Sequence, residues 1–297
     1  MSDLVQLVEV GPRDGLQNER ATVRVETRIS LVERLADAGL KSVEAGAFVS
    51  PKWVPQMAAS DDVLRGVRRK PGVAYPVLTP NMKGYLAART AGADMVAIFG
   101  AASETFSQKN INCSIAESID RFLPILEAAK SDGVAVRGYV SCVLGCPYEG
   151  DVAPAKVAEV SKRLFDAGCF EISLGDTIGA GTPRQTAGLI RAVRDVIPVD
   201  RLAGHFHDTF GQALANIWTA YEMGVRTFDS SVAGLGGCPY AKGASGNVAT
   251  EDVVYSFQRS GLDTGVDLDA VVSVADWISR ELGRAPQGKV TLARTTP

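Results

Sequence analysis

The sequence has few of the features that would assign it to a class at once. No stretch of about 18 apolar residues occurs, so we expect no membrane span. The net charge is only −3 and Lys and Arg are spread along the chain, which argues against a nucleic-acid partner. Five cysteines, an odd number, are scattered over 297 residues and do not indicate a disulfide framework. Because the N-terminus resembles no signal peptide or presequence, we expect a cytoplasmic protein with reduced thiols.

A regular alternation of helical and strand patterns runs along the chain. Amphipathic helical stretches end at a glycine, as at Gly39, Gly92 and Gly133, and short apolar strands follow them. The pattern predicts strands at 5–10, 42–45, 73–78, 95–99, 134–140, 170–174, 202–207 and 227–232. It predicts helices at 23–38, 55–69, 82–91, 114–131, 155–167, 183–196, 210–223 and 248–260, with a further one at 267–283.

Eight strands that alternate with eight helices indicate an α/β protein. We predict a (β/α)8 TIM barrel with an additional C-terminal helix. The alternative is an open, doubly wound sheet. Since no linker or change of composition divides the chain, residues 1–297 are expected to form a single TIM-barrel catalytic domain.

Histidine occurs only twice, at His205 and His207. In a strand, residues two positions apart project from the same face, so the two imidazoles would lie side by side. Such a pair is suited to bind a divalent metal. The alternative is a pair of histidines with only a structural role.

Acidic residues follow several of the predicted strands. Asp14, preceded by Arg13, comes after the first strand, Glu44 ends the second and Asp176 follows the sixth. In a barrel these strand ends meet at one mouth, where barrel enzymes hold their catalytic groups. Asp14 could complete a metal site with the histidines, while Arg13 could pair with Glu44 and stabilise negative charge. A surface ion pair that caps a turn is the other interpretation of Arg13 and Asp14.

The loop at 234–247 contains five glycines and one thiol, Cys238. Its spacing is not that of a phosphate-binding P-loop. A mobile lid that carries Cys238 to a pocket is a better interpretation.

Together these motifs resemble the 3-hydroxy-3-methylglutaryl-CoA (HMG-CoA) lyase family, in its bacterial form. The resemblance extends from Val8 to about Tyr255, and the stretch 234–241 is its most specific part. Its motifs are GPRDGLQNE (11–19), FVSPKWVPQM (48–57), KNINCS (109–114), GYVSCVLGCP (138–147), GDT (175–177), HFHD (205–208) and the loop around Cys238.

The resemblance implies a metal-dependent retro-Claisen cleavage of HMG-CoA to acetoacetate and acetyl-CoA, as in leucine and ketone-body catabolism. It also implies a homodimer that takes an acyl-CoA thioester. The implied metal ligands, suited to Mg²⁺ or Mn²⁺, are Asp14, His205, His207 and Asn247.

The resemblance also suggests roles for individual side chains. Arg13 would stabilise the enolate, Glu44 would hold Arg13, and Cys238 would act on the acid side. Three candidates for the general base remain open, and they are Asp14, His205 and Asp176. The implied substrate contacts, besides Arg13, are Gln17, Tyr139 and, for the CoA phosphates, Arg20.

The sequence departs from the best-known members of the family where 45–47 reads Ala-Gly-Ala, because those members carry hydroxyl residues there. The acyl group is therefore open, and one rival is a lyase for a longer 3-hydroxy-3-alkylglutaryl-CoA. A second rival is a condensing enzyme like the isopropylmalate or homocitrate synthases, although their usual C-terminal extension is not seen. A third is a metal-binding barrel without catalytic activity.

Overall fold

The computed structural model describes residues 4–19, 21–237 and 246–295. All of its strands run parallel in one sheet, in the order β2-β1-β9-β8-β7-β6-β5-β4-β3. The strands are β1 (Gln6–Glu9), β2 (Ser42–Val43), β3 (Gly46–Ala47), β4 (Val77–Leu78), β5 (Met95–Ala101), β6 (Ala135–Ser141), β7 (Glu171–Asp176), β8 (Leu202–Phe206) and β9 (Thr227–Ser230).

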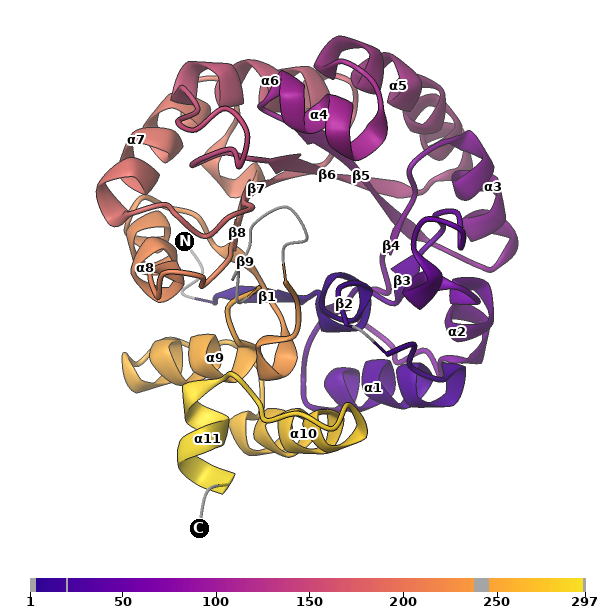
Figure 1. The fold of residues 1–297 in the computed structure, drawn as a ribbon, viewed down its shortest axis with the longest axis vertical. Helices are drawn as coiled ribbons and strands as arrows, with labels where there is room; N and C mark the ends of the chain where they lie inside the picture. The colour runs from indigo at the N-terminus through magenta and orange to yellow at the C-terminus, as the bar shows by residue number, and fades with distance from the viewer. Residues whose placement is uncertain (1–3, 20, 238–245, 296–297) are drawn as a thin grey trace.

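The sheet closes through β2 and β3, two short strands that are successive parts of one extended stretch. β2 pairs with β1, and β3 pairs with β4. Between them, Glu44 N donates to Glu9 O and Ala45 N donates to Pro76 O, both at 2.9 Å. The ring of strands is therefore continuous, as Figure 1 shows, and the prediction of a TIM barrel is confirmed.

Helices surround this ring on the outside (Figure 1). The additional C-terminal helix is confirmed as α10, and the short α11 follows it. The α-helices are α1 (Val25–Asp37), α2 (Ser60–Gly66), α3 (Met82–Thr90), α4 (Glu104–Ile111), α5 (Ile115–Asp132), α6 (Pro154–Asp166), α7 (Pro183–Arg194), α8 (Ala213–Glu222), α9 (Thr250–Arg259), α10 (Leu268–Glu281) and α11 (Lys289–Thr295). Within the described ranges, no helix is long and apolar enough to cross a membrane.

The predicted helix at 55–69 is wrong in its extent. The stretch begins with a 3₁₀ turn, η2 (Pro55–Met57), and α2 occupies only Ser60–Gly66. Ala59 separates the two with a φ of 55°, a left-handed conformation that an α-helix cannot include. Hydrophobic periodicity does not reveal such a break, because it depends on the backbone of one residue.

The carboxyl end of β1 is fixed by the buried side chain of Glu9. Its Oε1 accepts hydrogen bonds from Gly11 N at 2.8 Å and Val232 N at 2.9 Å. Its Oε2 accepts one from Thr250 Oγ1 at 2.6 Å. Glu9 therefore joins the first strand to the π-helical turn η1 (Gly11–Gly15), to the 3₁₀ turn η4 (Val232–Gly234) and to the start of α9.

We expect Glu9 to make the stability of the fold depend on pH. Burial outweighs the hydrogen bonds from Thr250, Val232 and Gly11 and raises the pKa of Glu9 from 4.5 to about 7. The folded protein therefore keeps a proton that the unfolded chain releases, so this contribution is complete below pH 4.5 and is lost as the pH rises through about 7. Between those limits the wild type should lose up to about 3 kcal/mol more unfolding free energy than Glu9→Gln.

Urea unfolding at pH 5 and pH 8 would measure this difference. Glu159→Gln, at a half-exposed position on α6, is the control and should follow the wild type. Parallel pH profiles for Glu9→Gln and the wild type would contradict the prediction.

Candidate active site

A cavity of about 960 Å³ opens at the carboxyl ends of the strands. The turn η1, the loop at 49–56, the end of α4 and strands β6 to β8 contribute to its wall, and Gly237 also lines it. Of the predicted site residues, those that line the cavity are Arg13, Asp14, Gln17, Tyr139, His205 and His207. The predicted convergence at the barrel mouth is therefore confirmed for this set.

Arg13 lies in the turn η1, which follows β1, and pairs with two carboxyl groups. Its Nε donates to Glu44 Oε2 at 2.7 Å, and its Nη1 donates to Asp14 Oδ1 at 2.6 Å. Burial alone would lower the pKa of Arg13, but the Glu44 and Asp14 carboxylates outweigh it and raise that pKa. The predicted pair of Arg13 with Glu44 is confirmed, and the guanidinium is a fixed positive charge at the cavity wall.

Asp14, His205 and His207 offer ligand atoms that all lie within 4.8 Å of one another. His205 is in β8 and His207 directly follows that strand, so the same strand presents both imidazoles. Their rings lie 5.3 Å apart between centroids. One carboxylate and two imidazoles at this spacing are a donor set that could hold a divalent metal ion.

The site makes the three groups electrostatically different. Burial would raise the pKa of Asp14, but Arg13, the two histidines and Asn247 lower it to about 2. Burial lowers the pKa of His207 to about 4, and the neighbouring His205 contributes. Burial also disfavours the charged form of His205, but Asp229 and Asp14 outweigh this and raise its pKa.

Asn247 lies beside this group, 233 positions from Asp14 in the sequence. Its Nδ2 donates to Asp14 Oδ2 at 2.8 Å and to Leu235 O at 3.3 Å. Its backbone forms an antiparallel bridge with that of His207. The structure therefore brings together all four residues that the resemblance implied as metal ligands.

The charge of the barrel interior also fits a divalent cation. Two guanidinium groups face four carboxyl groups, and these are Arg13 and Arg137 against Asp14, Glu44, Glu171 and Asp229. Carboxyl groups therefore outnumber guanidinium groups in this network, which favours the binding of a divalent ion. Such an ion would relieve the excess negative charge that burial makes costly.

Asp176 differs from the other predicted residues because its carboxylate is turned towards backbone. It accepts hydrogen bonds from Gly181 N at 2.8 Å and from Ala180 N at 3.3 Å. Burial raises its pKa, and these N–H groups only partly oppose the shift. Asp176 is absent from the cavity lining, so its contacts organise the loop after β7. The predicted Cys238 and Arg20 lie outside the described residues.

Sequence reasoning missed a buried network deeper in the barrel. Asp229, in the middle of β9, lies 3.1 Å from His205 Nδ1 and accepts a hydrogen bond from Ser173 Oγ at 2.7 Å. Arg137 on β6 forms an ion pair with Asp229 at 2.8 Å. The available signal was the placement of charged residues inside predicted apolar strands, where a charge requires a partner.

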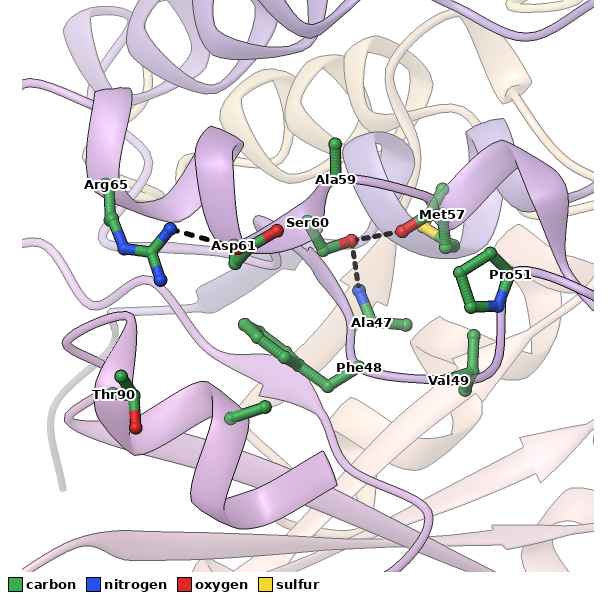
Figure 2. Close-up of a pocket in the computed structure, with 11 residues that line it drawn as sticks. Ala47, Phe48, Val49, Pro51, Met57, Ala59, Ser60, Asp61, Arg65 and Thr90 are labelled. Carbon is green, nitrogen blue, oxygen red and sulfur yellow. Dashed lines mark hydrogen bonds and ion pairs between the residues drawn. The ribbon is translucent and has the colours of Figure 1, made fainter. Parts of the chain in front are cut away.

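A second cavity, of about 310 Å³, lies outside the barrel mouth between α2 and α3 (Figure 2). Ala47 lines this smaller cavity, where its backbone N donates to Ser60 Oγ at 3.2 Å. Val49 lines both cavities. The Ala-Gly-Ala departure at 45–47 therefore faces the smaller cavity at Ala47.

The fold and this site define a (β/α)8 barrel with the donor set of a metal-dependent enzyme. A family model described as HMGL-like matches residues 4–278, and the chain belongs to that family. The predicted resemblance is thereby confirmed.

Relatives in this family resemble the chain over almost its whole length. The hydroxymethylglutaryl-CoA lyase of Pseudomonas mevalonii is 59% identical over 289 residues, which are 97% of this chain and 96% of that protein. A Pseudomonas aeruginosa protein named 3-hydroxy-3-isohexenylglutaryl-CoA/hydroxy-methylglutaryl-CoA lyase is 59% identical over 281 residues, 95% of this chain and 94% of that protein. The crystal structure of hydroxymethylglutaryl-CoA lyase from P. aeruginosa matches with a TM-score of 0.97 at 56% identity and covers 99% of this chain and 98% of that one.

Removal of either imidazole should weaken metal binding. His205→Ala and His207→Ala each take away one of the converging donors, so we expect at least a tenfold rise in the Kd for Mn²⁺, measured by isothermal titration calorimetry. Gln258→Ala, a change on α9 outside the cavity lining, is the control. Unaltered affinity in both histidine variants would refute the site.

Proposed function

We propose that this protein cleaves HMG-CoA to acetoacetate and acetyl-CoA with bound Mg²⁺ or Mn²⁺. The observation that supports this most strongly is the convergence of Asp14, His205 and His207 beside Arg13 in one cavity at the barrel mouth. The high identity to hydroxymethylglutaryl-CoA lyases over nearly the whole chain supports the same reaction. We further propose a single catalytic domain, a homodimer and a cytoplasmic location.

The reaction requires that the C2–C3 bond of the acyl group breaks. The C3 hydroxyl loses its proton and becomes the ketone of acetoacetate, while the bonding electrons pass to C2 and the thioester carbonyl. A proton delivered to C2 then completes acetyl-CoA, so no water or oxidant is consumed. A divalent ion held by Asp14, His205, His207 and Asn247 would supply Lewis acidity at the hydroxyl oxygen.

Arg13 has the geometry to stabilise the negative charge that develops on the thioester oxygen. Its guanidinium is buried and is fixed on two sides by Glu44 and Asp14. A positive charge that is already fixed needs little reorganisation when the substrate reacts. Glu44, itself buried, holds Arg13 in place and needs no contact with the substrate.

The contacts narrow the choice of general base. Asp176 is engaged by the N–H groups of its own loop, so we propose a structural role for it. Asp14 and His205 line the cavity, but a metal ion on Nε2 and Asp229 at Nδ1 would occupy both ring nitrogens of His205, so we propose that the hydroxyl proton leaves towards the Asp14 carboxylate. The acid is proposed to be Cys238, because the residue before it in the sequence, Gly237, lines the cavity.

Two of the residues assigned to the substrate also line the cavity. Gln17 has a buried Oε1 without a hydrogen-bond partner among the described residues, so it is free to accept one from the substrate. The Tyr139 ring lies 5.5 Å from the Arg13 guanidinium carbon and edge-on to His205. We propose that both contact the acyl group, and that Arg20 binds the CoA phosphates.

The first test is the release of acetoacetate from HMG-CoA by the purified protein. We expect release with Mg²⁺ or Mn²⁺, loss after chelation, and recovery when the metal is restored. Metal binding without release would contradict the proposed substrate, and would direct attention to the condensing reaction or to a binding role.

The P. aeruginosa relative named for the isohexenylglutaryl compound makes a longer acyl chain the second candidate. Competition between the two substrates discriminates, because the preferred one has the higher kcat/KM. A higher kcat/KM for the longer compound would show that this compound, and not HMG-CoA, is the main substrate.

We expect Cys238→Ala to lower kcat by at least a hundredfold while the Kd for Mn²⁺ is unchanged, because loss of a general acid affects turnover alone. Cys113→Ala removes another thiol, which is buried outside the cavity lining, and is the matched control. An unchanged kcat would remove Cys238 from the mechanism.

A further inference from the structure

We propose that Asp229 is a positioning residue, which orients His205 and fixes the tautomer in which its Nε2 can bind a metal ion. Arg137 in turn holds Asp229 in place. The inference rests on the proposed metal-dependent function, and it adds residues outside the cavity lining to the machinery.

The strand register places Asp229 directly beside His205. The two residues are paired across β8 and β9, so both side chains project to the same side of the sheet. Asp229 Oδ2 lies 3.1 Å from His205 Nδ1 and also accepts a hydrogen bond from Ser173 Oγ at 2.7 Å. Asp229 is 1% exposed and His205 is 9% exposed, so water does not compete for this contact.

This contact selects one tautomer of His205. A carboxylate only accepts hydrogen bonds, so Nδ1 must carry the proton that is shared with Asp229. In the neutral imidazole, Nε2 then has a free lone pair, which a metal requires. Carboxylates that accept from a metal-bound histidine also raise the basicity of the ligand and fix the plane of its ring.

Arg137 fixes the other side of the carboxylate. Its Nη2 is 2.8 Å from Asp229 Oδ1, its Nε is 2.6 Å from Glu171 Oε1, and its Nη1 donates to Tyr139 Oη at 2.9 Å. The side chain of Arg137 is 2% exposed and that of Asp229 is fully buried. Because Oδ1 faces Arg137, Oδ2 is left to face His205 and Ser173.

Among the residues that the structure describes, His205 alone of the two histidines receives this support. Within the described ranges, the ion pairs that involve a histidine are limited to His205 with Asp229. The two imidazoles therefore differ in what holds them, and a change at Asp229 should affect His205 while His207 keeps its place.

The test compares Asp229→Asn with Glu171→Gln. Both replace a carboxylate that pairs with Arg137 by an amide, but only Asp229 contacts His205. We expect the Kd for Mn²⁺, measured by isothermal titration calorimetry, to rise about 10- to 100-fold in Asp229→Asn. Glu171→Gln removes one negative charge from the same network but no contact with His205, so its Kd should rise much less than that of Asp229→Asn. Equal Kd values in the wild type and Asp229→Asn, or equal losses in both variants, would overturn the proposal.

A measurement on the wild type decides the question even if Asp229→Asn does not fold. Since the chain has only two histidines, ¹⁵N-histidine labelling gives only two sets of ring signals. In the Mg²⁺-loaded protein we expect His205 to be protonated at Nδ1, and an Nε2–H tautomer would overturn the assignment. Failure of the wild type to bind metal would instead contradict the proposed function.

Discussion

Buried charge at the mouth of the barrel must be balanced by groups from several strands, and this requirement determines the arrangement of the site. Arg13 lies between Asp14 and Glu44, and Arg137 lies between Glu171 and Asp229. Each guanidinium satisfies carboxylates that would otherwise be costly to bury, and loss of either would leave uncompensated negative charge. The remaining negative charge is what a divalent cation would neutralise.

The closed barrel makes this balance possible because it brings residues from distant parts of the sequence together. Asn247 and Asp14 are hydrogen-bonded although 233 positions separate them. Asp14 follows β1 and Asn247 lies in the segment after β9, and these two strands pair with each other and so join the end of the barrel to its beginning. Glu9 reinforces the same junction through the hydrogen bonds that it accepts from Val232 and Thr250. The contacts that stabilise the fold and those that shape the site therefore lie at the same junction between β9 and β1.

The sequence predicted the barrel and most of the cavity wall, because both depend on patterns of period and position. Glycines such as Gly39, Gly92 and Gly133 have the positive φ expected at helix ends, and the His-x-His pair lies at the end of one strand, with His205 in β8 and His207 directly after it. Asp229 was missed, because its role depends on register with a neighbouring strand, which periodicity does not define. Asp176 was selected for its position at a strand end, but the direction of its carboxylate depends on the loop that follows.

The partners of each buried acid distinguish the site from the scaffold. Asp14 and Asp229 each face a guanidinium and an imidazole, and the pKa of each is lowered to about 2 although burial opposes this. Glu9 and Glu251 accept hydrogen bonds only from neutral groups, so burial prevails and raises the pKa of each to about 7. Carboxylates of the first kind remain charged and can act on a metal or a ligand, whereas those of the second kind fasten the backbone.

By this criterion we propose that Asp176 belongs with the scaffold, because its donors are backbone N–H groups and its pKa is raised by burial. Glu44 is intermediate. It pairs with Arg13, yet burial prevails and raises its pKa, and its Oε1 has no hydrogen-bond partner among the described residues. A carboxylate in that state holds Arg13 firmly without competing for a cation. The role of each buried carboxyl group therefore follows from the groups that the strand register places beside it.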